Sequence, residues 1–218
     1  MVGDDDLVLF RKRIDADQAN RPEKAVLPEH VSIKTANALY YTLSIAGCML
    51  GIYVAFHIGA LKLGFIHLMS VAVLYYYSLK YKRIAFAGNI TVALMSALVI
   101  IIVWLFEFFA IKNDALAFAE MVGYFRTLNI LVLIYAFFAF LSNLIREMVK
   151  DIEDAEGDRV AGCRTIPIRY GETTARRIIV AASVVMLAFL GFVAWKYFAW
   201  DYHPAAWFMS IVLGSMWI

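Results

Sequence analysis

A run of acidic side chains follows a long apolar segment of this 218-residue chain. The run contains Glu147, Asp151, Asp154 and Asp158. On a continuous helix, which turns by about 100° per residue, these four carboxylates share an arc of about 60° on one face. Because like charges one turn apart repel each other, we expect a compensating cation. Oxygen ligands suit Mg²⁺, which typically takes one or two carboxylates and shares phosphate oxygens with a substrate.

Basic side chains accompany the carboxylates. Arg146 directly precedes the run, Lys150 lies within it, and Arg159 and Arg164 follow it. Arginine and lysine bind phosphate oxygens through charge-assisted hydrogen bonds, so the combination predicts a site for a diphosphate bridged by Mg²⁺. The charges alone leave open a solvated helix end without a ligand. The turn-forming stretch 162–167, which returns the chain to the membrane, favours the binding site.

Six apolar segments are long enough to cross a hydrocarbon layer of about 30 Å and must position these residues. They are 34–56, 60–79, 85–111, 125–146, 174–198 and 204–218. Hydrophobic residues make up 63% of the chain and charged residues 17%, whereas soluble domains carry about 25% charged residues. This composition excludes a soluble globular enzyme, a disordered chain and a disulfide-stapled secreted module. It predicts an all-α integral membrane protein, a bundle with about six transmembrane helices.

The distribution of Lys and Arg predicts the orientation of the bundle. Most of these 20 residues fall in the segments 11–34, 80–83 and 146–177, which lie on one side, and only Lys62, Lys112, Arg126 and Lys196 lie on the other. Positive loops face the cytoplasm, so we expect a polar cytoplasmic N-terminal segment (1–33) and a transmembrane bundle (34–218) with a cytoplasmic loop (147–173), in the cytoplasmic (inner) membrane. The net charge of +2 is too small to suggest nucleic-acid binding, so we expect no nucleic acid as a partner. Membrane lipid is the expected surrounding, and the oligomeric state stays unassigned.

Three motifs resemble the UbiA superfamily of intramembrane prenyltransferases. The most specific runs from Arg146 to Pro167 as R-E-x-x-K-D-x-E-D-x-x-G-D-x-x-x-G-x-x-T-x-P, like the family's second aspartate-rich motif. The second, Y-S-L-K at 77–80 followed by G-N-x-x-V-A at 88–93, is similar to the loop between the family's middle helices. The third and weakest, D-Q-A-N-R-P-E-K at 17–24, is similar to the segment that closes the first aspartate-rich motif.

The resemblance implies transfer of a polyprenyl group from a prenyl diphosphate to a lipid-accessible acceptor of the aromatic or glycerol-phosphate type. It implies Mg²⁺ held by the metal ligands Asp151, Asp154 and Asp158, and diphosphate contacts from Asn20, Arg21, Lys80, Arg146 and Lys150. Weaker site candidates are Asp17, Tyr77, Asn89, Asn143 and Glu147. The ring of Tyr77 is a candidate to stabilise an allylic cation. No residue is assigned as catalytic. The acidic motif looks most similar to the branch that acts on geranylgeranylglycerol phosphate.

The first aspartate-rich motif departs from the family pattern N-D-x-x-D-x-x-x-D. When Asp17 is taken as its last member, the positions four and eight residues earlier hold Arg13 and Leu9. The predicted spans are also fewer than the family bundle contains. The resemblance therefore predicts a chain truncated at both ends, and it leaves the activity of the chain as written an open question.

Other functions have weaker support in the sequence. A transporter or channel fragment is expected to carry ionisable residues inside its spans, and here only Glu107 does so, near the outer end. A phosphotransferase that uses cytidine nucleotides would need D-G-x-x-A-R, but Ala155 follows Asp154. A non-catalytic remnant that only packs in the membrane is the remaining alternative.

Overall fold

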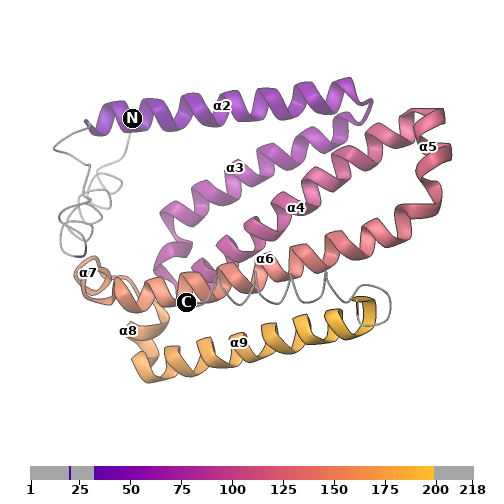
Figure 1. Ribbon diagram of the computed structural model, residues 1–218. Helices are drawn as coiled ribbons and strands as arrows, with labels where there is room; N and C mark the ends of the chain where they lie inside the picture. The colour runs from indigo at the N-terminus through magenta and orange to yellow at the C-terminus, as the bar shows by residue number, and fades with distance from the viewer. Residues whose placement is uncertain (1–19, 21–31, 199–218) are drawn as a thin grey trace.

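Five long helices form an elongated bundle (Figure 1). The computed structural model describes residue 20 and residues 32–198. The long helices are α2 (Ile33–His57), α3 (Gly64–Leu79), α4 (Ala87–Asn113), α6 (Phe125–Glu153) and α9 (Glu172–Val193). Five helical segments in the described part are long and apolar enough to cross a membrane, which confirms the all-α membrane class. The sixth predicted span, 204–218, lies outside the described residues.

Short helical segments connect the long ones. They are η2 (Leu61–Leu63), η3 (Tyr81–Arg83), α5 (Ala115–Met121), η4 (Val122–Tyr124), α7 (Ala155–Val160) and α8 (Ile166–Tyr170), and a π-helical turn, η5 (Ala194–Phe198), follows α9. The segments η3, α7 and α8 lie together at one end of the bundle, at the left in Figure 1, with α5 at the opposite end. We call the end formed by η3, α7 and α8 the motif end, because it holds residues of two motifs singled out in the sequence.

Two helices, α2 and α5, begin at residues whose side chains satisfy the first free backbone N–H groups. Ser32 Oγ accepts from the Thr35 N–H at 3.1 Å at the start of α2. Asp114 Oδ1 accepts from the N–H groups of Leu116 and Ala117 at the start of α5. Such caps contribute about 1 kcal/mol each to helix stability.

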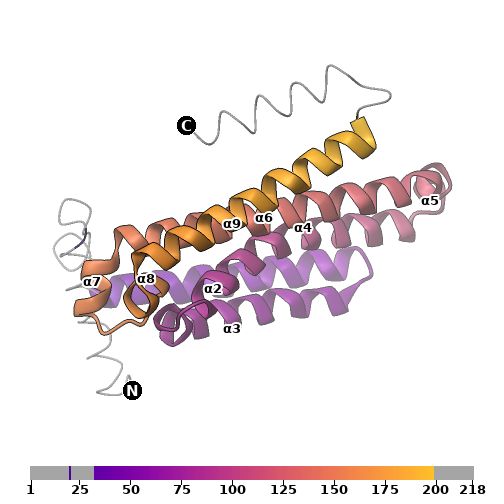
Figure 2. The same ribbon diagram turned by 90° about the horizontal axis from the view of Figure 1, so that it is seen from below.

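The long helices lie side by side in chain order (Figure 1), and the view from below shows that all of them run along the length of the bundle (Figure 2). Each long helix packs on the one before it, and α4 against α6 is the most extensive pair. The buried residues of α4 in this pair are small or polar, namely Gly88, Asn89, Ala93 and Ala97. Small residues allow two helix backbones to approach closely, which is the usual way for helices to associate in a membrane.

Few side chains on the long helices are fully buried, as expected for helices whose outer surfaces face lipid. Two buried clusters hold the second half of the bundle together. Leu141 and Ile145 of α6 meet Met186 of α9 in the middle of the bundle. Nearer the motif end, a second cluster joins α6, α8 and α9 through Met148, Ile166 and Ala175. This second cluster fixes the short helix α8 beneath the acidic motif.

The predicted cytoplasmic loop 147–173 is helical over most of its length. It consists of the end of α6, the helices α7 and α8, and the start of α9. With 29 residues, α6 is about 43 Å long, more than the roughly 30 Å of a hydrocarbon layer. The predicted span ends at residue 146, where the apolar residues end. The helix itself continues to Glu153, because a helix can extend beyond the hydrocarbon layer into water. The acidic residues thus stand on an extension of a spanning helix.

Candidate functional site

The backbone bends at Asp154, between α6 and α7. The predicted acidic face assumed one continuous helix as far as Asp158, but α6 ends at Glu153 and α7 begins at Ala155. Gly157 lies inside α7. Hydrogen bonds from the Asp154 N–H to Lys150 O (2.8 Å) and from the Asp158 N–H to Asp154 O (2.9 Å) carry the backbone through the bend. Asp151 therefore stands on one helix and Asp158 on the next.

Helix α7 ends in a Schellman motif around Gly162. The Cys163 N–H donates to Asp158 O at 2.8 Å, and the Gly162 N–H donates to Arg159 O at 3.1 Å. Gly162 has a φ of +73°, a conformation that costs residues with a Cβ about 1–2 kcal/mol. Immediately afterwards, the Arg164 N–H donates to Arg83 O at 3.0 Å, so the segment after α7 is tied to the connection between α3 and α4.

Replacing Gly162 with Ala is expected to lower the free energy of unfolding by about 1 kcal/mol, because the methyl group disfavours the positive φ. Nothing lies within 4 Å of the added Cβ, so the effect is conformational and not steric. A thermal or denaturant titration in detergent measures it. Gly191→Ala is the matched control, because Gly191 lies inside α9 with equal space around it, and there Ala is expected to stabilise. Equal stability changes in both variants would contradict the assignment.

Asp151 lies at the centre of the acidic cluster, by which we mean the carboxylates of Glu147, Asp151, Asp154 and Asp158. Its Oδ2 accepts a hydrogen bond of 2.9 Å from Asn89 Nδ2 in the first turn of α4, and Asn89 is 5% exposed. The charges of Asp158, Glu147 and Asp154 all act unfavourably on a charged Asp151. The structure thus brings the other three predicted carboxylates within electrostatic range of Asp151, although α6 ends before Asp158.

The donor set fits a divalent cation that is shared with a substrate. Among the described residues, no three His, Cys, Asp or Glu side chains converge on one metal position. Mg²⁺ commonly binds through one or two carboxylates, waters and substrate phosphates, and oxygen-only ligands around Asp151 match that pattern. The assignment of Asp151, Asp154 and Asp158 as metal ligands stays a prediction.

A tight turn before α4 sets the position of Asn89. Phe86 has a φ of +66°, and the Ala87 N–H donates to Ala85 O at 2.9 Å, which is a strained γ-turn. Gly88 then lies so close to η3 that a Cβ there would be 3.0 Å from Tyr81 O. The two features bring the start of α4, and Asn89 with it, close against η3 at the motif end.

The side chain of Asn20 is hydrogen-bonded to the bend between α6 and α7. Its Nδ2 donates to Asp154 O at 3.1 Å, and its Oδ1 accepts from the Gly157 N–H at 2.8 Å. The motif at 17–24 thus contacts the acidic motif at 146–167. The predicted contact of Asn20 with a diphosphate stays a prediction. Asp17 and Arg21, the other candidates in this motif, lie outside the described residues.

The predicted phosphate-binding residues in the described part stand at the motif end or close to it. Lys80 follows α3 and is exposed, and Lys150 is half-buried on α6. Arg146 is 70% exposed, and its Nη1 contacts Glu147 Oε1 at 3.1 Å. Tyr77 lies close to the start of α4, since a Cβ on Gly88 would be 3.6 Å from its ring. Their contacts with a diphosphate stay predictions.

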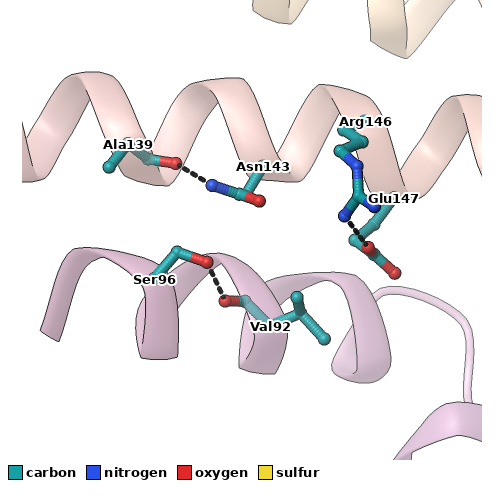
Figure 3. A network of polar contacts seen from close by, with 6 residues as sticks. All are labelled: Val92, Ser96, Ala139, Asn143, Arg146 and Glu147. Carbon is teal, nitrogen blue, oxygen red and sulfur yellow. Dashed lines mark hydrogen bonds and ion pairs between the residues drawn. The ribbon is translucent and has the colours of Figure 1, made fainter. Parts of the chain in front are cut away.

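Polar side chains continue from the acidic cluster toward the middle of the bundle. Figure 3 shows Asn143 and Glu147 pointing from α6 toward α4. Asn143 Nδ2 donates to Ala139 O at 3.0 Å, and Ser96 on α4 donates to Val92 O at 3.0 Å. Sequence reasoning did not single out Ser96. Ser96 follows Asn89 by seven residues, and this spacing places both side chains on the same face of α4. That spacing was the feature of the sequence that could have indicated Ser96.

The comparison with known proteins gives consistent results. The profile of the UbiA prenyltransferase family matches residues 9–218. The digeranylgeranylglyceryl phosphate synthase of Methanothermobacter thermautotrophicus is 30% identical over 181 residues, which cover 83% of this chain and 54% of that protein. The synthase of the same name from Pyrococcus abyssi is 34% identical over 179 residues, 81% of this chain and 56% of that protein.

The chain spans about half the length of these curated relatives, and no solved structure matches it. The family match nevertheless covers almost the whole sequence, and it includes the acidic motif, the bend at Asp154 and the glycine-asparagine pair that starts α4. These are also the residues that meet at the motif end. The chain belongs to the UbiA prenyltransferase family.

Proposed function

We propose that this chain transfers a polyprenyl group from a prenyl diphosphate to the hydroxyl of a glycerol-phosphate lipid, with Mg²⁺ as the cofactor. The observation that carries the proposal is the position of Asp151. Its carboxylate is hydrogen-bonded to a buried amide and surrounded by the charges of three further carboxylates, at the end of a bundle of apolar helices. Such a concentration of negative charge needs a cation, and oxygen ligands suit Mg²⁺.

The proposed reaction uses two chemical environments, the charged site at the motif end and the apolar surroundings provided by the helices. Asp151, Asp154 and Asp158 would supply the carboxylate ligands, no more than two of them to one ion, and the metal when bound supplies positive charge for the departing diphosphate. Lys80, Arg146 and Lys150 add positive charge at the same end, where negative charge develops on the diphosphate as the allylic C–O bond breaks. A new C–O bond then forms to the acceptor oxygen, and the hydroxyl proton is lost. The apolar helices provide an environment with little water, which would otherwise capture the allylic cation.

The acceptor class is supported by the names of the relatives. The proteins from Methanothermobacter thermautotrophicus, Pyrococcus abyssi and Sulfolobus acidocaldarius are digeranylgeranylglyceryl phosphate synthases. Their product contains two geranylgeranyl groups, so the expected reaction joins a geranylgeranyl donor to geranylgeranylglyceryl phosphate. We propose the same substrates for this chain, with the motif end on the cytoplasmic side of the cytoplasmic membrane.

The test uses the purified chain in liposomes with labelled geranylgeranyl diphosphate and a panel of acceptors. In Mg²⁺, a labelled ether lipid is expected with geranylgeranylglyceryl phosphate and not with aromatic acceptors. Removing the metal with EDTA should abolish the product, and adding Mg²⁺ back should restore it. Product that persists in EDTA would overturn the Mg²⁺ assignment, and product only with an aromatic acceptor would overturn the acceptor class. Flux of the substrate across the membrane without any covalent product would instead favour a transporter fragment.

A further inference from the structure

Asn20 connects two parts of the chain that are far apart in sequence. Its amide bonds to Asp154 O and to the Gly157 N–H, 134 and 137 residues away. Both partners are backbone groups at the bend between α6 and α7. An amide that both donates and accepts fixes the distance between these two groups, which a side chain with a single hydrogen-bonding function cannot do.

Gly157 provides the space that this contact needs. A Cβ at position 157 would lie 2.5 Å from Cγ, Nδ2 and Oδ1 of Asn20, closer than real Cβ contacts. Gly157 has helical backbone geometry within α7, so a side chain at this position would be unfavourable because it would displace the Asn20 amide and not because of the φ of the residue. The absence of a Cβ at position 157 thus leaves room for the Asn20 amide to make both hydrogen bonds.

The bend that Asn20 holds separates the predicted metal ligands. Asp151 belongs to α6, Asp154 forms the bend, and Asp158 belongs to α7. The angle between the two helices therefore decides where Asp158 stands relative to Asp151. We propose that Asn20 is a positioning residue, which holds the bend so that the carboxylates on either side of it bind one metal–diphosphate unit. This role rests on the proposed function.

The first experiment measures metal binding and not turnover. Mn²⁺ replaces Mg²⁺, and its binding to the full chain with geranylgeranyl diphosphate is followed by electron paramagnetic resonance. Asn20→Ala is expected to weaken Mn²⁺ binding roughly 10-fold, as loss of a residue that orients metal ligands typically does. Asn113→Ala is the control, because Asn113 also donates to a distant backbone carbonyl, that of Ile58, but lies at the opposite end of the bundle. Unchanged Mn²⁺ affinity in Asn20→Ala would overturn the proposal.

The second experiment decides whether the contact exists independently of any metal. Hydrogen exchange of the Gly157 amide in the metal-free chain is expected to accelerate roughly five-fold in Asn20→Ala, the effect of losing about 1 kcal/mol of hydrogen bonding. It should stay unchanged in Asn113→Ala. If the wild-type chain binds no Mn²⁺ at all, the proposed function fails, whereas an unchanged exchange rate in Asn20→Ala overturns the positioning role itself.

Two variants distinguish the steric effect of a Cβ at position 157 from the loss of the positioning role of Asn20. Gly157→Ala should displace Asn20 and weaken Mn²⁺ binding by a similar factor. Adding Asn20→Gly to Gly157→Ala removes the clash, so the melting temperature should rise to that of Asn20→Gly alone while Mn²⁺ binding stays weak. Gly157→Ala with wild-type Mn²⁺ affinity would contradict the proposal.

Discussion

Asp151→Asn is expected to lower the rate of Mg²⁺-dependent prenyl transfer by roughly 10²–10³-fold, the usual cost of removing one preorganised electrostatic group. The substitution keeps the shape of the side chain and removes its charge. The amide oxygen that it introduces can still accept from Asn89 Nδ2, which in the wild-type chain donates at 2.9 Å to Asp151 Oδ2. The melting temperature should therefore change little, so that a loss of activity can be attributed to the missing negative charge and not to unfolding.

The matched control for this variant is Asp114→Asn. Asp114 caps α5 at the opposite end of the bundle, far from the motif end. It is expected to keep its transfer rate and to lose about 1 kcal/mol of stability at most. A rate in Asp151→Asn within a few-fold of the wild-type rate would show that the carboxylate is not part of the site.

Asn89→Asp has the second large expected effect, on stability as well as on activity. It would place two carboxylates at hydrogen-bond distance in a position where residue 89 is 5% exposed. A buried charge without a partner of opposite sign costs about 3 kcal/mol or more, so we expect a clear fall in melting temperature and loss of transfer. Thermal unfolding in detergent and the liposome assay measure the two effects.

The exchange variant, Asn89→Asp combined with Asp151→Asn, separates these two effects. It restores one hydrogen bond between the two positions with donor and acceptor reversed, so stability should recover. The carboxylate then stands on α4 and not on α6, so transfer should stay low. Wild-type stability in Asn89→Asp alone would contradict the observed contact, and full transfer in the exchange variant would contradict the need for a carboxylate on α6.

The sequence was sufficient to predict the spans and the acidic motif, because both depend on local features. Apolar segments of about 20 residues located the five helices in the described part, with ends that differ by a few residues. The spacing of Glu147, Asp151 and Asp154 placed three carboxylates along α6 and its C-terminal cap. The same local reasoning placed the membrane boundary at 146, although α6 continues to Glu153.

The contacts that build the site could not be predicted, because they join residues far apart in sequence. Asn89 meets Asp151 across 62 positions, and Asn20 meets Gly157 across 137. The bend at Asp154 carries no Gly or Pro signal. Gly157 provides room for Asn20, and no local feature of the sequence indicates this contact. The positive φ of Phe86 has no signal either, since an aromatic residue is not expected in that conformation.

The three motifs of the sequence meet at one end of the bundle. Asn20 joins the motif at 17–24 to the acidic motif at 146–167. Asn89, from the motif at 77–93, joins that motif to Asp151. The backbone hydrogen bond from Arg164 to Arg83 connects the same two regions again. These contacts give the acidic cluster a fixed place relative to the basic residues that follow α3.

Equilibrium binding of labelled geranylgeranyl diphosphate to the purified chain, titrated with Mg²⁺ and repeated in EDTA, tests the central claim most directly. We expect saturable binding that requires Mg²⁺, is lost in EDTA, and is weakened roughly 10²-fold or more in Asp151→Asn. Binding of equal strength with and without Mg²⁺, or binding that Asp151→Asn leaves untouched, would contradict a metal–diphosphate site at the motif end.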